Sequence, residues 1–444
     1  MRKFVWPFVT IILSVLFSGC FVVENPYTGV APGLWRAVLK LEYVPITPNP
    51  KGEPLPEKVN LQFDEITEGE LPFTFDVIYE NETDFYIEII NGEERQKVEN
   101  IRFGRDLQTG KDTIKIDFPV YDSYIEAIVE ESIMEGKWVV NNRGSYSIPF
   151  VARQGRDHRF TTLSKEPVMD ISGKWETHFS DPDGDFDAIG VFEQEGNHLT
   201  GTFLTETGDY RYLEGSVQAN KVYLSTFDGA HAFLFEAKIL EDSTMIGSFR
   251  SGKHYQVTWE AKRNEDYTLK DPLELTHLNE GYDKVDFSFK NTEGQMISLS
   301  DDKYKDKVKI VQILGTWCPN CRDETKYLTQ YLKENNHPDL EVVALSFEKY
   351  RDENKAMDAL KRYKTHFGFD YDILLAGYYN KKEAVKSLPM LNHILSYPTM
   401  IFIDRNENVR RIHTGFSGPA TEEYQEFTED FENFVTQLLE EPNQ

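Results

Sequence analysis

The sequence has little cysteine, little positive charge and few long apolar runs. Its 444 residues include three cysteines, and 48 Lys and Arg stand against 75 Asp and Glu, for a net charge of -27. Such a charge repels a phosphate backbone, so we expect no nucleic-acid partner. Beyond the first 20 residues no apolar run approaches the length of a membrane-spanning helix, so we expect no transmembrane span in the mature protein.

Aromatic residues are plentiful, because 30 Phe, 23 Tyr and 6 Trp make up 13% of the chain. In many segments before residue 263 they alternate with polar residues, a pattern typical of strands. With 40% hydrophobic residues, the chain is long enough for about three domains, each with its own core. The composition therefore predicts a strand-rich, multidomain protein and excludes a disordered or collagen-like one.

The first 20 residues have the layout of an export signal. Two basic residues precede an apolar stretch from Phe4 to Phe17, and small residues follow it. The segment 16–20, LFSGC, resembles a bacterial lipobox, which implies that the thiol of Cys20 carries a diacylglycerol. We therefore expect residues 1–19 to be a lipoprotein signal peptide and Cys20 to anchor the protein in a membrane. The alternative is an ordinary cleaved signal followed by an incidental cysteine.

Two strand-rich domains are expected after a tether at residues 20–32. They span residues 33–160 and 170–263, where short alternating segments are separated by Gly, Asn or Asp turns. Asn91-Gly92 is typical of a two-residue hairpin turn. We interpret both domains as closed or nearly closed antiparallel barrels of about eight strands. The interior of such a barrel is either filled by side chains or holds one small ligand. The sequence therefore leaves open whether the β domains bind an unknown ligand.

The two β domains repeat one plan. Gly33-Leu34-Trp35 recurs as Gly173-Lys174-Trp175, residues 134–138 (MEGKW) recur as 245–249 (MIGSF), and residues 146–153 match 255–262. Self-similarity of this kind indicates duplicated architecture.

After a polar linker at residues 264–279, strand and helix patterns alternate through residues 280–440. An alternation of this kind predicts an α/β domain. We expect strands at 308–314, 342–347, around 373, 399–404 and 409–413, and helices at 321–332, 353–366, 379–390 and 422–439. The expected fold class is therefore two antiparallel β-barrel-like domains followed by an α/β domain.

The two remaining cysteines, Cys318 and Cys321, are expected at the junction between the first of these strands and its helix. Free amides and the positive end of the helix dipole stabilise a thiolate there, so Cys318 is expected to attack and Cys321 to resolve. Half of a zinc site and a structural bridge are the alternatives. Zinc needs four ligands, and no second pair or suitably spaced histidine is found, so we expect no metal and no cofactor.

Trp317-Cys318-Pro319-Asn320-Cys321 together with Tyr397-Pro398-Thr399 resembles the thioredoxin superfamily, and more closely the TlpA/ResA-like thiol-disulfide oxidoreductases. The resemblance covers residues 280–440 and implies a thioredoxin-like domain. It implies a cis Pro398 facing the disulfide, with Trp317, Tyr397 and Thr399 beside the substrate. It further implies that Glu324 raises the pKa of Cys321 and exchanges protons with it, the alternative being a solvated glutamate.

Together these patterns predict a lipid-anchored thiol-disulfide oxidoreductase in the bacterial cell envelope, facing the periplasm and reducing protein disulfides. The resemblance implies protein thiols or disulfides as partners, apocytochromes among them, and an upstream membrane electron donor. Pro319-Asn320 does not fix the direction of transfer, so an oxidase or isomerase remains an alternative. Two other classes remain, a ligand-binding envelope lipoprotein with an accessory redox domain and a thiol peroxidase, whose usual Thr-to-Cys spacing the motif lacks.

Overall fold

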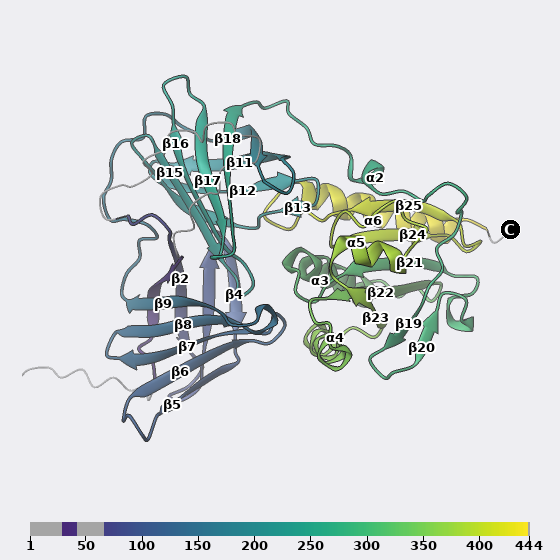
Figure 1. Cartoon of the computed structure of the whole chain (residues 1–444), viewed down its shortest axis with the longest axis horizontal. Helices are drawn as coiled ribbons and strands as arrows, with labels where there is room; N and C mark the ends of the chain where they lie inside the picture. The colour runs from purple at the N-terminus through teal and green to yellow at the C-terminus, as the bar shows by residue number, and fades with distance from the viewer. Residues whose placement is uncertain (1–28, 42–65, 443–444) are drawn as a thin grey trace, which may run out of the picture.

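Three β-sheets organise the chain, whose computed structural model describes residues 29–41 and 66–442. In Figure 1 the two antiparallel sheets of the first half lie one above the other, and the α/β domain lies beside them. The expected order, two barrel-like domains and then an α/β domain, is confirmed.

The first β domain is an open sheet of nine strands in the order β4-β3-β2-β1-β9-β8-β7-β6-β5. Among the described residues its two edge strands, β4 and β5, do not pair with each other, so the sheet does not close. Its strands are β1 Gly33–Lys40, β2 Glu70–Tyr79, β3 Phe85–Asn91, β4 Glu94–Val98, β5 Ile101–Arg105, β6 Asp112–Phe118, β7 Ser123–Glu130, β8 Ile133–Val140 and β9 Tyr146–Gln154.

The second β domain, here called the barrel, is closed because β11 pairs with β12 as well as with β10. Its interior is filled by aromatic rings, with Phe179 between 5.6 and 6.5 Å from the ring centroids of Phe203, Phe235, Phe249 and Trp259. Its strands are β10 Gly173–Ser180, β11 Phe186–Glu195, β12 His198–Thr205, the short β13 Gly208–Asp209 beside β12, β14 Leu213–Gln218, β15 Lys221–Phe227, β16 Ala232–Ile239, β17 Met245–Ser251 and β18 Tyr255–Arg263.

The repeated plan is visible in the strand register. Met134 pairs with Ala152 and Trp138 with Ile148 in the first β domain, as Met245 pairs with Ala261 and Phe249 with Val257 in the barrel. Trp35 and Trp175 are also equivalent: each is fully buried, and each indole nitrogen donates to a carbonyl four residues earlier, at 2.9 and 2.8 Å. The duplicated architecture is therefore present in the pairing itself.

Strands β15 and β16 join the two β domains because both of their faces are buried. On β15, Val222 and Leu224 pack inside the barrel, whereas Tyr223 and Phe227 pack into the core of the first β domain. The ring of Phe227 stacks on Phe73 of β2 with centroids 4.4 Å apart. The wall of the barrel thus covers the core of a sheet that does not close on itself.

The hairpin turn predicted at Asn91-Gly92 lies one residue later. Asn91 is the last residue of β3 and pairs with the first residue of β4, so the turn consists of Gly92 and Glu93. The side chain of Asn91 is fully buried between the two β domains: its oxygen accepts from Arg159 and its nitrogen donates to the carbonyl of Phe227, both at 2.9 Å. A residue type common in turns is used here as an interdomain link.

The C-terminal domain has a seven-stranded sheet in the order β20-β19-β23-β22-β21-β24-β25, in which β21, β22 and β23 are parallel. Within the described residues, no helix is long and apolar enough to cross a membrane. The helices and strands of the C-terminal domain are α2 Pro272–Leu275, β19 Ser288–Asn291, β20 Met296–Ser298, β21 Val308–Leu314, α3 Pro319–Glu334, β22 Leu340–Glu348, α4 Glu353–Phe367, β23 Asp372–Tyr378, α5 Lys381–Ala384, β24 Thr399–Ile403, β25 Val409–Thr414 and α6 Glu423–Glu440.

Two segments of this domain differ from expectation. The helix predicted at 379–390 is reduced to α5 and one 3-10 turn that ends at Ser387, two residues before Pro389, a residue that cannot continue a helix. The end of the predicted linker is docked on the domain, because the hydroxyl of Thr414 donates to that of Thr276 at 2.7 Å and Asn279 donates to a backbone carbonyl.

Replacing the buried indole of the barrel tests the packing of the repeat. We expect Trp175→Ala to lower the free energy of unfolding by about 3–5 kcal/mol, because a large cavity opens in a closed aromatic core. Urea titration of the full chain measures the change. Tyr282→Ala, at a ring that is 48% exposed, is the control and should change stability by less than about 1 kcal/mol. An equal loss of unfolding free energy in both variants would contradict the assignment of Trp175 to the core of the barrel.

Candidate active site

The cysteine pair lies where a buried strand gives way to a helix. β21 is buried along its whole length and ends at Leu314, and α3 begins at Pro319. Gly315 leaves room for the ring of Trp317, since a Cβ at this glycine would lie 2.4 Å from the indole nitrogen. That nitrogen donates to the carbonyl of Phe347 at 2.9 Å, which ties the turn to β22.

Cys318 is the N-cap of α3. Its sulfur accepts a hydrogen bond from the backbone amide of Cys321 at 3.2 Å, and its thiol donates to the carbonyl oxygen of Tyr397 at 3.2 Å. Cys318 is 6% exposed, whereas Cys321 is fully buried. Free amides and the helix dipole stabilise a thiolate at this position, so Cys318 is the sulfur suited to attack a disulfide.

Cys321 lies one turn into α3, and both cysteines are free thiols. Burial raises the pKa of the Cys321 thiol, and the hydrogen bond and charge of Cys318 raise it further, with a contribution from Glu324. A thiol with a raised pKa stays protonated while its neighbour reacts. The geometry therefore suits Cys321 to a second, resolving step.

Glu324 is fully buried on the same helix. One carboxylate oxygen accepts from the side-chain nitrogen of Gln312 at 2.8 Å, and the other oxygen has no hydrogen-bond partner among the described residues. Burial raises the pKa of Glu324 to about 8, although the bond from Gln312 lowers it. The carboxyl group is therefore mostly protonated at neutral pH and exchanges its proton close to pH 8.

The loop before β24 completes the surroundings of the sulfur. The peptide bond between Tyr397 and Pro398 is cis, as the resemblance implies. The Tyr397 ring meets that of Trp317 edge-on, with centroids 5.6 Å apart. Thr399 is 1% exposed and donates its hydroxyl to a carbonyl of the same loop at 3.0 Å. Trp317 and Tyr397 thus lie beside Cys318, whereas Thr399 is closed off from a substrate.

A cavity of about 300 Å³ opens in front of Cys318, and all three domains line it. The first β domain contributes Tyr121 and Arg143, and the barrel contributes residues 207–210 at β13. Trp317 and Tyr397 belong to the lining, but Pro398 does not. The β domains therefore form part of the entrance to the redox site.

Sequence analysis missed three side chains near the sulfur. Glu348, fully buried at the end of β22, accepts from the amide and the hydroxyl of Thr316 at 3.0 and 2.9 Å. The amine of Lys349 lies 4.2 Å from the ring centroid of Trp317. Glu348 ends the parallel strand β22 and Lys349 follows it. This position was a usable signal in the sequence, because functional residues gather at the carboxyl ends of such strands. Arg143 is remote in sequence and carried no such signal.

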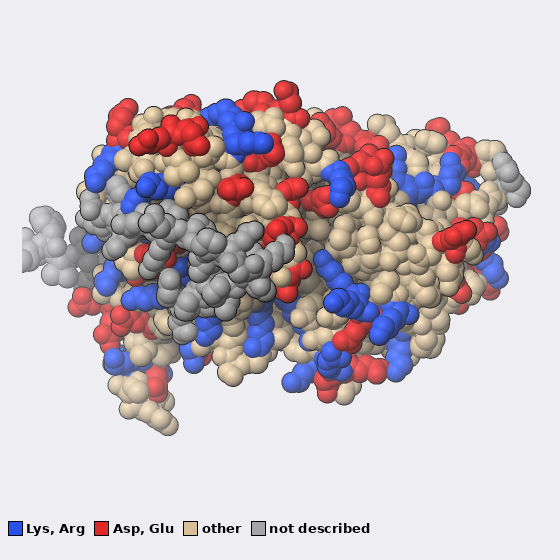
Figure 2. Space-filling model, turned by 45° about the horizontal axis from the view of Figure 1, so that its top comes forward, with Lys and Arg blue, Asp and Glu red and all other residues tan. Residues whose placement is uncertain are grey.

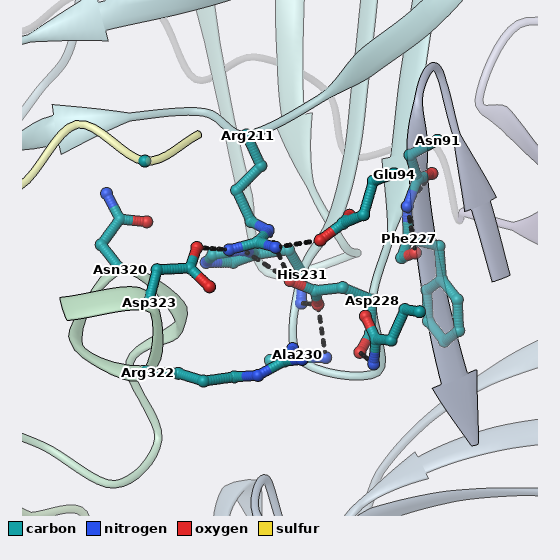
Figure 3. Close-up of polar contacts among 12 residues, drawn as sticks. Asn91, Glu94, Arg211, Phe227, Asp228, Ala230, His231, Asn320, Arg322 and Asp323 are labelled. Carbon is teal, nitrogen blue, oxygen red and sulfur yellow. Dashed lines mark hydrogen bonds and ion pairs between the residues drawn. The ribbon is translucent and has the colours of Figure 1, made fainter. Parts of the chain in front are cut away.

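Arg211 of the barrel ties the three domains together beside the site (Figure 3). It forms ion pairs with Glu94 of β4, with Asp228 at 3.4 Å and with Asp323 of α3. Burial lowers the pKa of Arg211, but the three carboxylates outweigh burial and raise it overall. The φ angle of Arg211 is 61°, a left-handed conformation that is unfavourable for a residue other than glycine. Arg211 thus forms three ion pairs from a position between β13 and β14.

The turn between the cysteines also contacts the barrel. The side-chain nitrogen of Asn320 donates to the carbonyls of Asp209 and Phe416, both at 3.2 Å. Gly208 lies against this amide, because a Cβ there would be 2.3 Å from the Asn320 nitrogen. The amide of Gly418 donates to Asp209 at 3.2 Å, so the long turn after β25 docks on β13.

Two further expectations concern lipid and metal. Cys20 lies outside the described residues. Within residues 29–41 and 66–442, no group of three His, Cys, Asp or Glu side chains is placed to hold a metal ion.

Removing the titrating carboxyl of Glu324 tests its buried state. Its pKa is raised in the folded protein to about 8, so ionisation destabilises the fold progressively as pH rises from the unfolded value of 4.5 towards 8. We expect Glu324→Gln to match the wild type near pH 4 and to exceed its stability by more than about 2 kcal/mol above pH 8. Urea titrations across this pH range measure the difference. Glu334→Gln, at an exposed position of α3, should give a flat difference, and a flat Glu324→Gln difference would refute the buried neutral carboxyl.

Removing the guanidinium of Arg211 tests the link between domains. We expect Arg211→Met to cost about 3–5 kcal/mol, because three carboxylates lose a buried counter-ion. Urea unfolding gives the cost, and limited proteolysis between the domains reports their separation. Arg102→Met breaks an exposed pair with Asp117 and should cost less than about 1 kcal/mol. A small effect at Arg211 would exclude it as the link.

Comparison with known proteins places this domain. Residues 281–412 match the AhpC/TSA family. The thioredoxin-like protein YneN of Bacillus subtilis is 30% identical over 138 residues, 31% of this chain and 73% of YneN. The thiol-disulfide oxidoreductase ResA of the same organism is 26% identical over 138 residues, 31% of this chain and 69% of ResA. A thiol:disulfide interchange protein of Chlorobium tepidum, of known structure, is 21% identical, with a TM-score of 0.28 over 36% of this chain and 98% of its own. The chain belongs, through its C-terminal domain, to the thioredoxin-like thiol-disulfide oxidoreductases of the AhpC/TSA family.

Proposed function

We propose that this protein reduces disulfides of other proteins in the bacterial cell envelope, held to a membrane by a lipid on Cys20. One observation carries the redox part of this proposal. Cys318 caps α3 and is still reachable at 6% exposure, while Cys321 lies fully buried one turn behind it. A reachable sulfur backed by a buried one is the arrangement that a two-step disulfide exchange requires.

The reaction proceeds in two exchanges. The thiolate of Cys318 attacks one sulfur of the substrate disulfide, forming a mixed disulfide and releasing the other substrate sulfur as a thiolate. Cys321 then gives up its proton, for which the ionised form of Glu324 is the acceptor, and attacks the sulfur of Cys318. The second substrate thiolate leaves, and the protein retains a disulfide between Cys318 and Cys321. Two electrons pass to the substrate, and an upstream membrane donor later returns the pair to the dithiol.

The substrate is held beside the aromatic wall of Trp317 and the loop of Tyr397, Pro398 and Thr399. Tyr397 and Trp317 line the cavity in front of Cys318, which supports a role in contact with substrate. Thr399 acts through the shape of the loop, since its side chain is buried. Protein disulfides are the proposed substrates, and apocytochromes before haem attachment are one class that the family resemblance implies.

An envelope location rests on the sequence before the described residues. The apolar stretch from Phe4 to Phe17 and the LFSGC segment that ends at Cys20 support export and lipid attachment. The active cysteine pair then faces the compartment outside the cytoplasm. In such an oxidising compartment a dithiol needs a supplied source of electrons.

Trapping the intermediate tests the proposed order of attack. We expect Cys321→Ser to accumulate a mixed disulfide through Cys318, because the resolving sulfur is absent. Gel electrophoresis without reductant and mass spectrometry of the adduct identify the sulfur involved. Cys318→Ser is the matched control and should form no adduct. An adduct carried by Cys321 in that control would reverse the assigned roles.

The reduction potential tests the direction of transfer. We expect the Cys318/Cys321 pair of the full chain to titrate as one two-electron couple below about -230 mV, in the range of thioredoxin. A value above about -150 mV would instead make the protein a disulfide donor. The absence of any two-electron transition would overturn the proposed function as a whole.

A further inference from the structure

Three basic side chains, Arg143, Lys349 and Lys381, line the same cavity as Cys318. We call them the basic trio. They come from two domains, Arg143 from the first β domain and both lysines from the C-terminal domain. The face of the molecule in Figure 2 carries acidic side chains over both halves, with basic ones among them. In a chain of net charge -27, a gathering of cations at the reacting sulfur needs a physical reason.

None of the trio forms an ion pair with a carboxylate of the described residues. The amine of Lys349 lies over the rings of Trp317 and Tyr379, 4.2 and 5.8 Å from their centroids. The guanidinium of Arg143 contacts His254, and the amine of Lys381 donates to a backbone carbonyl. Burial, together with repulsion from Arg143, lowers the pKa of Lys349 to about 7. Arg143 and Lys349 are partly buried, whereas Lys381 is exposed at the rim of the cavity. A partly buried cation without a carboxylate partner is costly, and an anion entering the cavity would remove that cost.

Two carboxyl groups beside the trio offset its charge only in part, although Glu348 interacts electrostatically with Lys349. Glu348 accepts hydrogen bonds from Thr316 and Ser346, and burial raises its pKa. Asp209, which lines the cavity, accepts from the amide of Gly418, and burial raises its pKa to about 7. Both groups therefore carry less negative charge at neutral pH than exposed carboxylates do. Lys349, with a pKa of about 7, is itself only partly charged at neutral pH, so the positive balance of the cavity depends mainly on Arg143 and Lys381.

The size of the cavity limits what enters it. Its volume of about 300 Å³ is at the lower end for ligand sites, and walls from three domains surround it. Residues of β13 and Tyr121 line it together with residues of the C-terminal domain. A compact group or a narrow chain segment fits such a space, whereas a folded surface does not.

We propose that the basic trio forms an anion-binding subsite that selects disulfides flanked by carboxylates. This inference rests on the proposed function and names the substrate class of the same site. The reaction is the exchange already described: the carboxylate-bearing disulfide gains two electrons and two protons, and the cysteine pair is oxidised to its disulfide. The trio binds the substrate carboxylate while Cys318 attacks the adjacent sulfur. The carboxylates belong either to a small disulfide or to an acidic peptide segment that carries one.

Rates with matched small disulfides test the subsite. The reduced full chain reacts with dithiodipropionate, hydroxyethyl disulfide and cystamine, which are anionic, neutral and cationic, and stopped-flow fluorescence follows each oxidation. We expect the anionic disulfide to react at least about tenfold faster than the neutral one, with the cationic one slowest. Arg143→Gln and Lys349→Gln should lose most of this preference. Lys382→Gln removes the same charge at an exposed position next to Lys381 and should keep it.

The trio also lies close enough to stabilise the Cys318 thiolate, so a second measurement separates the two effects. Alkylation by neutral iodoacetamide reports the thiolate alone, and alkylation by anionic iodoacetate reports the thiolate together with recruitment of an anion. We expect the ratio of iodoacetate to iodoacetamide rates to fall in Arg143→Gln and Lys349→Gln. A ratio that stays at the wild-type value would mean that the trio acts only on the thiolate, and would overturn the inference.

The remaining outcomes are distinct. Equal rates with all three disulfides reject the subsite and leave the proposed function intact, whereas no reaction with any of them removes both. A peptide disulfide with flanking aspartates, compared with its asparagine counterpart, identifies the source of the carboxylate. Preference for the acidic peptide assigns a protein segment. Preference confined to the small anionic disulfide assigns a low-molecular-weight substrate.

Discussion

One buried guanidinium holds the three domains around the redox site. Arg211 belongs to the barrel, yet its partners are Glu94 of the first β domain, Asp228 of the barrel and Asp323, two residues beyond Cys321. Charges buried away from water need their partners, so the three domains cannot separate without leaving buried ions unpaired. The placement of the β domains in front of Cys318 depends on this cluster.

The β domains act as one platform because they share a core. The first sheet leaves its edges β4 and β5 unpaired with each other, and the outer faces of β15 and β16 cover its interior. The loop between those two strands carries Asp228, so the contact that completes the sheet also positions an acid for Arg211. The packing between the two β domains therefore also positions the side chains that line the entrance of the active site. Redox chemistry resides in one domain, and access to it is shaped by the other two.

The chain as a whole is strongly acidic, whereas the cavity at the active site is lined by basic side chains. Glu324 and Asp209 are buried acids whose pKa values rise to about 8 and about 7, so both lose negative charge near neutrality. Arg143 and Lys349 approach the same cavity from different domains. Less negative charge and more positive charge beside Cys318 both favour an anionic partner in the cavity. The electrostatic pattern of the site thus suits the proposed substrate.

The sequence by itself determined features set by near neighbours in the chain. The strand that ends at Leu314, the helix that starts at Pro319, and a cysteine between them are a local pattern, and so is the repeated tryptophan motif of the β domains. Only the tertiary structure decided that Asn91 links two domains instead of turning a hairpin, and that β15 is buried on both faces. Only the tertiary structure brought Arg143 to the sulfur of a cysteine 175 residues away in the chain. Periodicity and turn chemistry report the immediate surroundings of a residue, whereas contacts between domains depend on packing that no local pattern encodes.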